Sequence, residues 1–269
     1  QVWGSYQRAC IFDSSGSKKN ISLGAFSSTS ESAASSINNN NKVVGWATGG
    51  GYFRAYLFDS TGAGNNIDLG TLGGRGSTAN EISENNVIVG WADNESGNQR
   101  ACIFDITGSG NNIDLGTLGG GSSFAYDANA NGLIIGDSES SGGDQIACLF
   151  DVTGNWNNIN LGTLGGNRSR AIDLNISNQA VGWAYIDAET KHACLFDITG
   201  AGANIDLNNV VDPTLGWTLN AAYSINDLGW IVGEGINSDG ESHAYLLIPE
   251  PASILFILGG LLAIRSKSA

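Results

Sequence analysis

The stretch Ile67-Asp68-Leu69-Gly70-Thr71-Leu72-Gly73-Gly74 decides how the chain is interpreted, because it recurs along the sequence. Close copies occupy residues 113–120 and 159–166, and degenerate copies begin at Ile21 and Ile205. The five copies start 46 residues apart. A fixed period of this length is typical of a repeat architecture, in which each unit forms one supersecondary structure.

Composition limits the class of protein and its partners. The chain has 269 residues, which is enough for one large β domain or two small ones. Its 12 Lys and Arg against 26 Asp and Glu give a formal net charge of −14. Such a surface repels a phosphate backbone, so a nucleic-acid partner is not expected. The 39 Gly predict many turns between short strands.

Each repeat contains four short apolar segments. In the unit that starts at Ile67 they are residues 67–72, 79–82, 87–91 and 100–105. They are rich in β-branched and aromatic residues and are bounded by Asn, Gly and Ser, so they are predicted to be strands.

An Asp-x-Thr-Gly or Asp-x-Ser-Gly sequence follows the fourth segment in five units. The aspartates are Asp13, Asp59, Asp105, Asp151 and Asp197. Asp at the first position and Gly at the fourth favour a type I turn. The alternative is a calcium loop, but calcium requires 6–8 oxygen ligands and the closely spaced acids of such a loop are missing. Turns are therefore the favoured interpretation.

The cysteines share one position of the repeat. They are Cys10, Cys102, Cys148 and Cys194, and the other two copies have Tyr56 and Tyr245 there. The exchange of Cys for Tyr indicates a packing position. Equivalent strands of neighbouring repeats are normally too far apart for a disulfide, which needs Cα atoms within about 7 Å. Free buried thiols are expected, with disulfides and a metal site as the alternatives; no metal and no cofactor are predicted.

Four strands in about 46 residues suit the blade of a β-propeller. The third and fourth segments occur six times, the first and second five times, if Val2-Trp3-Gly4 is counted as a third segment. The sequence therefore predicts an all-β, six-bladed propeller whose first and last blades are incomplete, each with three strands from this chain. Residues upstream of Gln1 are expected to supply the missing strands. Without them, the open blade edges are expected to favour self-association.

Residues 1–248 resemble the HAF-type extracellular repeat. The resemblance rests on Asp-Leu-Gly-Thr-Leu-Gly-Gly, Ile-Asn-Asp-x-Gly and Val-x-Gly-Trp, together with Gly216-Trp217-Thr218-Leu219 and His243-Ala244-Tyr245-Leu246. It implies a secreted bacterial protein whose biochemical role is undefined.

Residues 249–269 resemble a PEP-CTERM sorting tail. Pro249-Glu250-Pro251 precedes the apolar stretch 252–264 and a short basic end with Arg265 and Lys267. The resemblance implies a hydrophobic helix, processing by a membrane exosortase, transient membrane anchoring and a final location at the cell surface or outside the cell. A helix of this length spans about 20 Å, less than the ~30 Å hydrocarbon core. The alternative is a helix that packs on the β domain.

A basic residue begins the fourth segment in five of six units. These residues are Arg8, Arg54, Arg100, His192 and His243. Strand beginnings lie at the faces of a propeller, so the side chains are expected to form a ring on one face, which is a candidate site for an anionic group such as an acidic polysaccharide. The alternative is that each one pairs with an acid of its own unit.

Two classes of function follow from these patterns. No nucleophile elbow, phosphate loop or His-Glu-x-x-His motif is present, which favours a non-catalytic structural or ligand-binding protein. The alternative is a secreted propeller enzyme acting on polysaccharide, because paired carboxylates are set by space and not by sequence. Trp46, Trp91 and Trp183 could stack on sugars but are predicted to be core residues.

Overall fold

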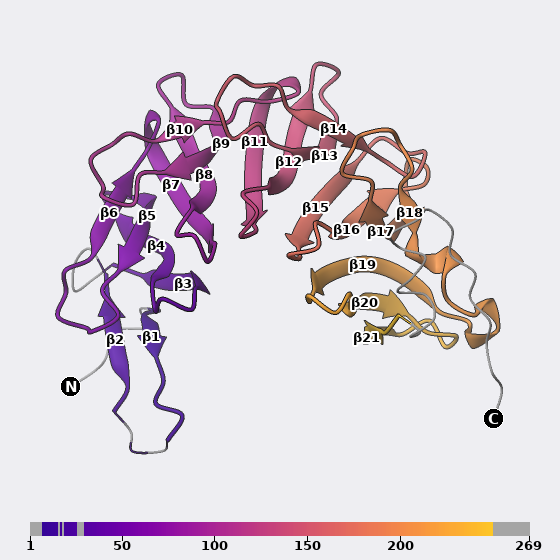
Figure 1. The fold of residues 1–269 in the computed structure, drawn as a ribbon, viewed down its shortest axis with the longest axis horizontal. Coiled ribbons are helices and arrows are strands. Elements are labelled where there is room, and N and C mark those ends of the chain that lie inside the picture. The colour runs from indigo at the N-terminus through magenta and orange to yellow at the C-terminus, as the bar shows by residue number, and fades with distance from the viewer. Residues whose placement is uncertain (1–6, 16, 18, 26–29, 250–269) are drawn as a thin grey trace. The chain divides into compact units, whose positions relative to one another are not determined.

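The computed structural model describes residues 7–15, 17, 19–25 and 30–249. These residues form an all-β protein, as predicted (Figure 1). The predicted C-terminal helix over 252–264 and the predicted strand at Val2–Gly4 lie outside the described residues. Two short 3-10 helices, η1 (Leu207–Asn209) and η2 (Pro213–Leu215), were not predicted.

The described strands form six antiparallel sheets, and in each sheet the strands follow one another in chain order. The first sheet has β1 (Ala9–Ile11) and β2 (Ile21–Gly24); the second has β3 (Ser32–Ile37), β4 (Val43–Gly49), β5 (Tyr52–Phe58) and β6 (Ile67–Gly70); the third has β7 (Gly73–Ile82), β8 (Ile88–Asn94), β9 (Gln99–Phe104) and β10 (Ile113–Asp114). The fourth has β11 (Gly119–Ala128), β12 (Ile134–Ser140), β13 (Gln145–Leu149) and β14 (Ile159–Gly162); the fifth has β15 (Ser169–Leu174), β16 (Ala180–Tyr185), β17 (Lys191–Phe196) and β18 (Ile205–Asp206); the sixth has β19 (Thr218–Ile225), β20 (Ile231–Ile236) and β21 (Ser242–Leu247).

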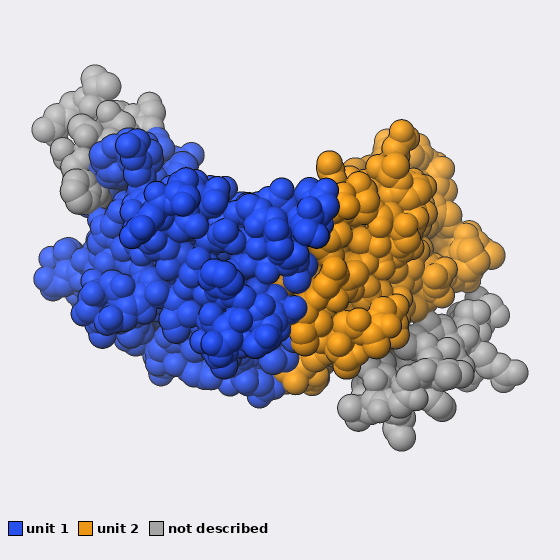
Figure 2. All heavy atoms as spheres, turned by 90° about the horizontal axis from the view of Figure 1, so that it is seen from above, with its two compact units in different colours: residues 1–143, 149–158 blue, residues 144–148, 159–269 orange. Residues whose placement is uncertain are grey.

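The chain divides into two compact units, coloured separately in Figure 2. One comprises residues 1–143 and 149–158, and the other comprises residues 144–148 and 159–269.

All four predicted segments are strands, but the sequence repeat and the sheet are offset by one strand. The Ile-Asp-Leu-Gly stretch is the last strand of one sheet and leads directly into the first strand of the next, as β6 leads into β7. The first strand is also longer than predicted, since β7 begins at Gly73 and not near Ala79. Residues 73–76 at the start of β7 have low β-propensity, so contacts with other parts of the fold determine where this strand begins.

The glycine of each Val-x-Gly-Trp segment is required by a bulge in the neighbouring strand. The register of β7 against β8 shifts between Ala79 and Glu81, next to Gly90. A Cβ at Gly90 would collide with the carbonyl oxygen of Thr78. Equivalent shifts occur in four other sheets, so the close approach is a property of the repeat.

Consecutive sheets are joined by a buried serine hydroxyl. Ser77 of β7 accepts a hydrogen bond from the backbone N–H of Ala55 at 3.0 Å and donates to the carbonyl oxygen of Gly70 at 2.6 Å. Ser77 is fully buried. Ser32, Ser123 and Ser169 make the same two bonds to the sheet that precedes each of them. The hydroxyl thus satisfies backbone groups that the ladder leaves unpaired.

An asparagine makes a second link between neighbouring sheets. The side chain of Asn112 accepts from the N–H of Asp105 at 2.8 Å and donates to the carbonyl oxygen of Leu69 in the preceding sheet at 2.8 Å. Corresponding bonds are made by Asn66, Asn158 and Asn204. The loop after each third strand is therefore fixed to the sheet before it.

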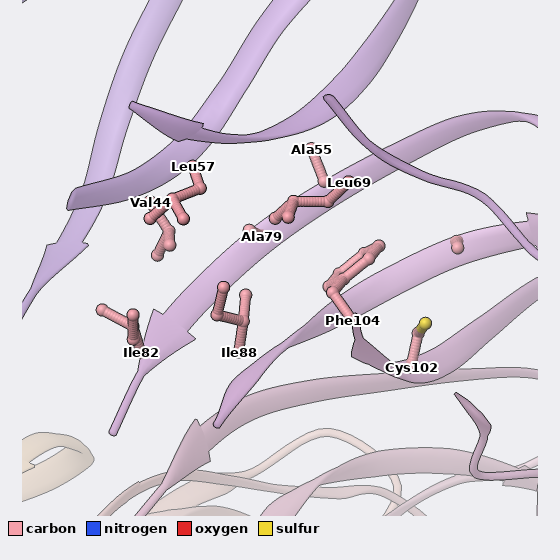
Figure 3. Packing of buried hydrophobic residues seen from close by; sticks show 10 residues of the cluster. Val44, Ala55, Leu57, Leu69, Ala79, Ile82, Ile88, Cys102 and Phe104 are labelled. Atoms are coloured by element: carbon pink, nitrogen blue, oxygen red, sulfur yellow. The ribbon is translucent and has the colours of Figure 1, made fainter. Parts of the chain in front are cut away.

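Apolar side chains fill the space between the linked sheets (Figure 3). Val44 and Leu57 of one sheet pack against Ile82, Ile88 and Phe104 of the next. The two polar links bond backbone groups of Ala55 and Leu69, which belong to this buried apolar layer, where an unpaired group would be costly.

Replacing Ser77 by Ala tests the serine link. We expect the free energy of unfolding to fall by about 1–3 kcal/mol, because the Ala55 N–H and the Gly70 carbonyl both lose their buried partner. Urea unfolding of the full chain measures the change. Ser96→Ala, at an exposed hairpin position, serves as the control and should change stability by less than about 0.5 kcal/mol. Equal stability of the two variants would contradict the role assigned to Ser77.

Candidate functional site

The basic position of the repeat forms ion pairs within individual sheets. Arg54 of β5 lies beside Asp68 of β6, with Nη2 and Oδ1 3.1 Å apart. The Arg54 guanidinium also donates to the carbonyl oxygen of Arg75 at 3.4 Å. Both members of the pair are partly exposed, so solvent screens their attraction.

The two histidines at this position also have acidic neighbours. His192 Nδ1 lies 2.7 Å from Asp206 Oδ2, and both side chains are 15% exposed. This pair joins β17 to β18 just as Arg54 and Asp68 join β5 to β6. His243 Nε2 lies 3.4 Å from Glu241 Oε2 at the exposed start of β21.

The alternative that a basic residue pairs with an acid of its own unit is confirmed for Arg54, His192 and His243, although the individual acids were not predicted. Asp68 and Asp206 stand at the same place of the Ile-Asp-Leu stretch, and Asp114 of β10 occupies this place relative to Arg100 of β9. In the one unit where the basic residue is Ile146, the Asp is replaced by Asn160. The two charges are thus lost together. This joint replacement is visible in the sequence and could have predicted the pairing.

The five basic residues lie at or next to the start of equivalent strands, but their local settings differ. Arg54, His192 and His243 each have a carboxylate within their own sheet. Arg8 precedes β1, where Ser22 occupies the place of the acid. The Arg100 Nε is buried and has no hydrogen-bond acceptor among the described residues.

The tryptophans of the Val-x-Gly-Trp segments are half-buried, so the prediction that they belong to the core is wrong. The valine two residues earlier in the same strand is fully buried instead, as Val89 is before Trp91. The indole of Trp91 lies near the ring of Phe124 in the next sheet, with ring centroids 6.4 Å apart. Trp183 has the Arg170 and Lys191 cations over its ring, each 5.6 Å from the ring centroid.

The Asp-x-Thr-Gly sequences form turns, as predicted. Asp105 Oδ1 accepts from the backbone N–H of Thr107 at 2.9 Å and from its hydroxyl at 2.7 Å, and Oδ2 accepts from the N–H of Asn111 at 3.3 Å. These bonds, led by the Thr107 hydroxyl, lower the pKa of Asp105 to about 2. The carboxylate oxygens are engaged by N–H and O–H donors of their own loop. No group of three or more His, Cys, Asp or Glu suited to a metal occurs within the described ranges.

The four cysteines are free thiols. Cys102, Cys148 and Cys194 are fully buried, and Cys10 is half-buried. Burial raises the pKa of the Cys102 and Cys194 thiols far above the usual range, so neither thiol is suited to nucleophilic chemistry.

The sixth sheet has an exposed apolar surface, here called the terminal face: Tyr223, Trp230, Val232 and Leu246. Val232 is 44% exposed, whereas the equivalent Val89 and Val181 are fully buried. Leu246 is 54% exposed. In the described part of the chain, β21 pairs only with β20. An apolar face beside an unpaired strand edge is typical of an interaction surface.

Comparison with known proteins gives no identification. No protein-family profile matches the chain, and no curated protein is significantly similar to it. Among the residues with described positions, no helix is long and apolar enough to cross a membrane. Of the predicted sorting motif, Pro249 is the last described residue, and Glu250 and Pro251 lie outside the description.

The Asp105 turn makes a prediction about acid stability. Because the folded-state pKa lies below the ordinary value, the turn stabilises the fold above about pH 4, and this contribution is lost as the pH falls through about 2. Asp105→Asn should therefore lower Tm at pH 6 but have little effect at pH 2. Thermal melts from pH 7 to pH 2 measure the difference.

Thr107→Val is the matched control, since it removes one donor and leaves the carboxylate. It should show a smaller difference in Tm with the same pH dependence. A loss of Tm in Asp105→Asn that is constant over the whole pH range would contradict this account.

Proposed function

We propose that the protein is a non-catalytic bacterial surface protein in which the six sheets are the blades of a β-propeller. The observation that supports this most directly is the repeated sheet-to-sheet packing, made by the same serine, asparagine and apolar positions in successive units. Antiparallel meanders stacked face to face are the building plan of propeller blades. In such a ring, a further sheet of the same repeat would cover the terminal face. We also propose that two copies of the protein can associate through this face.

We propose export and surface sorting from the resemblance of the C-terminal residues to a PEP-CTERM tail. An exosortase-type enzyme would be the partner of Pro249, Glu250 and Pro251, and the membrane would contact the tail alone. The described β sheets end at Leu247, so removal of the tail would leave their strands intact.

The mass of exported protein tests this sorting proposal. When the full chain is expressed with an exosortase, the extracellular material should have lost the residues after about position 249. The Pro249→Ala/Pro251→Ala double variant should keep the full mass and remain with the membranes. Full-length unprocessed protein in the medium would contradict the proposal.

The proposed ligand is an acidic polysaccharide at the basic position of the repeat. Arg54 supports this choice, because its side chain is still 27% exposed while paired with Asp68. A guanidinium offers five donors, and a glycan carboxylate or hydroxyl could use those that Asp68 and the Arg75 carbonyl leave free. The neighbouring carboxylate also competes with an anionic ligand, so binding is expected to be weak per unit and to gain strength from repetition.

Arg54 and its partner give opposite predictions for glycan binding. With a tetramer of galacturonic acid as probe, Arg54→Ala should weaken binding about fivefold, or roughly 1 kcal/mol. Asp68→Asn should strengthen binding, because it removes the competing anion. The affinity should fall as salt rises from about 0.05 to 0.5 M, because salt screens exposed charges.

Arg168→Ala is the matched control, since it removes one exposed positive charge at a different position of the repeat. It should leave the affinity unchanged. Absence of any salt-dependent binding, or equal effects of Arg54→Ala and Arg168→Ala, would contradict the ligand proposal. Cleavage of the tetramer would assign the protein to the enzymes.

A further inference from the structure

Trp156 occupies a backbone position that is glycine in the corresponding loops. The loop of residues 151–158 matches loops in which Gly64, Gly110 and Gly202 stand at this place, with φ between 85° and 87°. Trp156 has φ 63°. A left-handed conformation is uncommon for any residue with a Cβ and unfavourable for a bulky one. Such an outlier is a reason to look for a function.

The fold of the loop does not depend on the indole. The N–H of Asp151 donates to Asn158 at 2.8 Å, and the equivalent bond from Asp105 to Asn112 is also 2.8 Å with glycine in place of the tryptophan. The turn and the link to the preceding sheet are therefore complete without a large side chain. Trp156 adds strain without adding to the common framework of the loop.

The indole is nevertheless held in a fixed position. Its Nε1 donates to the carbonyl oxygen of Asp114 at 3.0 Å. One side of the ring system lies against Gly116, where a Cβ would collide with the indole. Trp156 is still 57% exposed. The result is a rigid aromatic surface at the end of β10 that is open to solvent.

Polar side chains flank this surface along the chain. Asn155 and Asn157, on either side of Trp156, are exposed. An exposed flat ring flanked by two amides suits a small ligand with an apolar face and a polar edge.

We propose that Trp156 is a stacking platform for the ring of a pyranose sugar in a polysaccharide, with the exposed amides of Asn155 and Asn157 on either side of it to bond hydroxyl groups of the sugar. The C–H groups on one face of a pyranose match an aromatic ring, and its hydroxyl edge matches the polar border. A rigid tryptophan provides contact area at a low cost in conformational entropy. The inference rests on the proposed function as a polysaccharide-binding surface protein, and it assigns the position of one site.

The indole N–H signals provide a direct test. The chain has seven tryptophans, so 15N-labelled protein gives up to seven indole resonances, and the Trp156 resonance is the one lost in Trp156→Gly. Adding a tetramer of galacturonic acid or of galactose should shift this resonance. Trp156→Gly should weaken binding at least tenfold, while Trp156→Phe, which keeps an aromatic ring, should weaken it less than about threefold. Trp230→Ala, which removes a 40% exposed indole on the sixth sheet, should leave the affinity unchanged.

Stability separates a binding role from a structural one. Because three loops of the repeat use glycine here, Trp156→Gly should change Tm by no more than about 4 °C. A larger loss of Tm, or wild-type affinity in this variant, would overturn the proposal. A shift of another indole with Trp156 unmoved would also overturn it and leave polysaccharide binding intact. If neither tetramer binds the full chain at low salt, this inference and the proposed ligand class both fail.

Discussion

The buried serine hydroxyl that joins each sheet to the next is the constraint on which the described structure depends. The register of the third strand against the fourth shifts between Ala55 and Tyr56, and this leaves the N–H of Ala55 and the carbonyl oxygen of Gly70 directed at the boundary to the next sheet. A residue such as Ser77 supplies both a donor and an acceptor there without opening the apolar layer. At the last boundary the serine is absent and Asn208 fulfils this role, donating to the Leu219 carbonyl and accepting from the Leu219 N–H.

A boundary of this kind gives every inner sheet two different faces. One face presents the phenylalanine two residues after the cysteine position, and the other presents the valine that directly precedes the glycine of the third segment, such as Val89 before Gly90. Phe104 and Val89 are both buried because a sheet lies on each side. Phe12 of the first unit is 75% exposed and Val232 of the sixth sheet is 44% exposed. A valine face packs against a phenylalanine face where two sheets meet, as Val44 does against Phe104. The first sheet exposes a phenylalanine face and the sixth exposes a valine face, and this match is the physical basis of the propeller proposal.

The sequence predicted the strands and turns well, because the period of 46 residues and the Asp-x-Thr-Gly signals are local. It did not predict the offset between repeat and sheet, since strand pairing is decided by contacts between units. Trp91 is half-buried because the next sheet covers only part of its side chain, and no local sequence pattern determines how far the next sheet extends. The pairing of Arg54 with Asp68 was accessible in principle through the joint change to Ile146 and Asn160.

Native-state hydrogen exchange of the full chain tests the central claim most directly. The N–H groups of Ala55 and Ala101 donate across a sheet boundary to Ser77 and Ser123. If these links hold the sheets together, both amides should open with a free energy within about 1 kcal/mol of the strand-centre amide of Val89, because the sheets open as one unit. Opening free energies several kcal/mol below that of Val89 would show that each sheet opens independently, and would contradict the account.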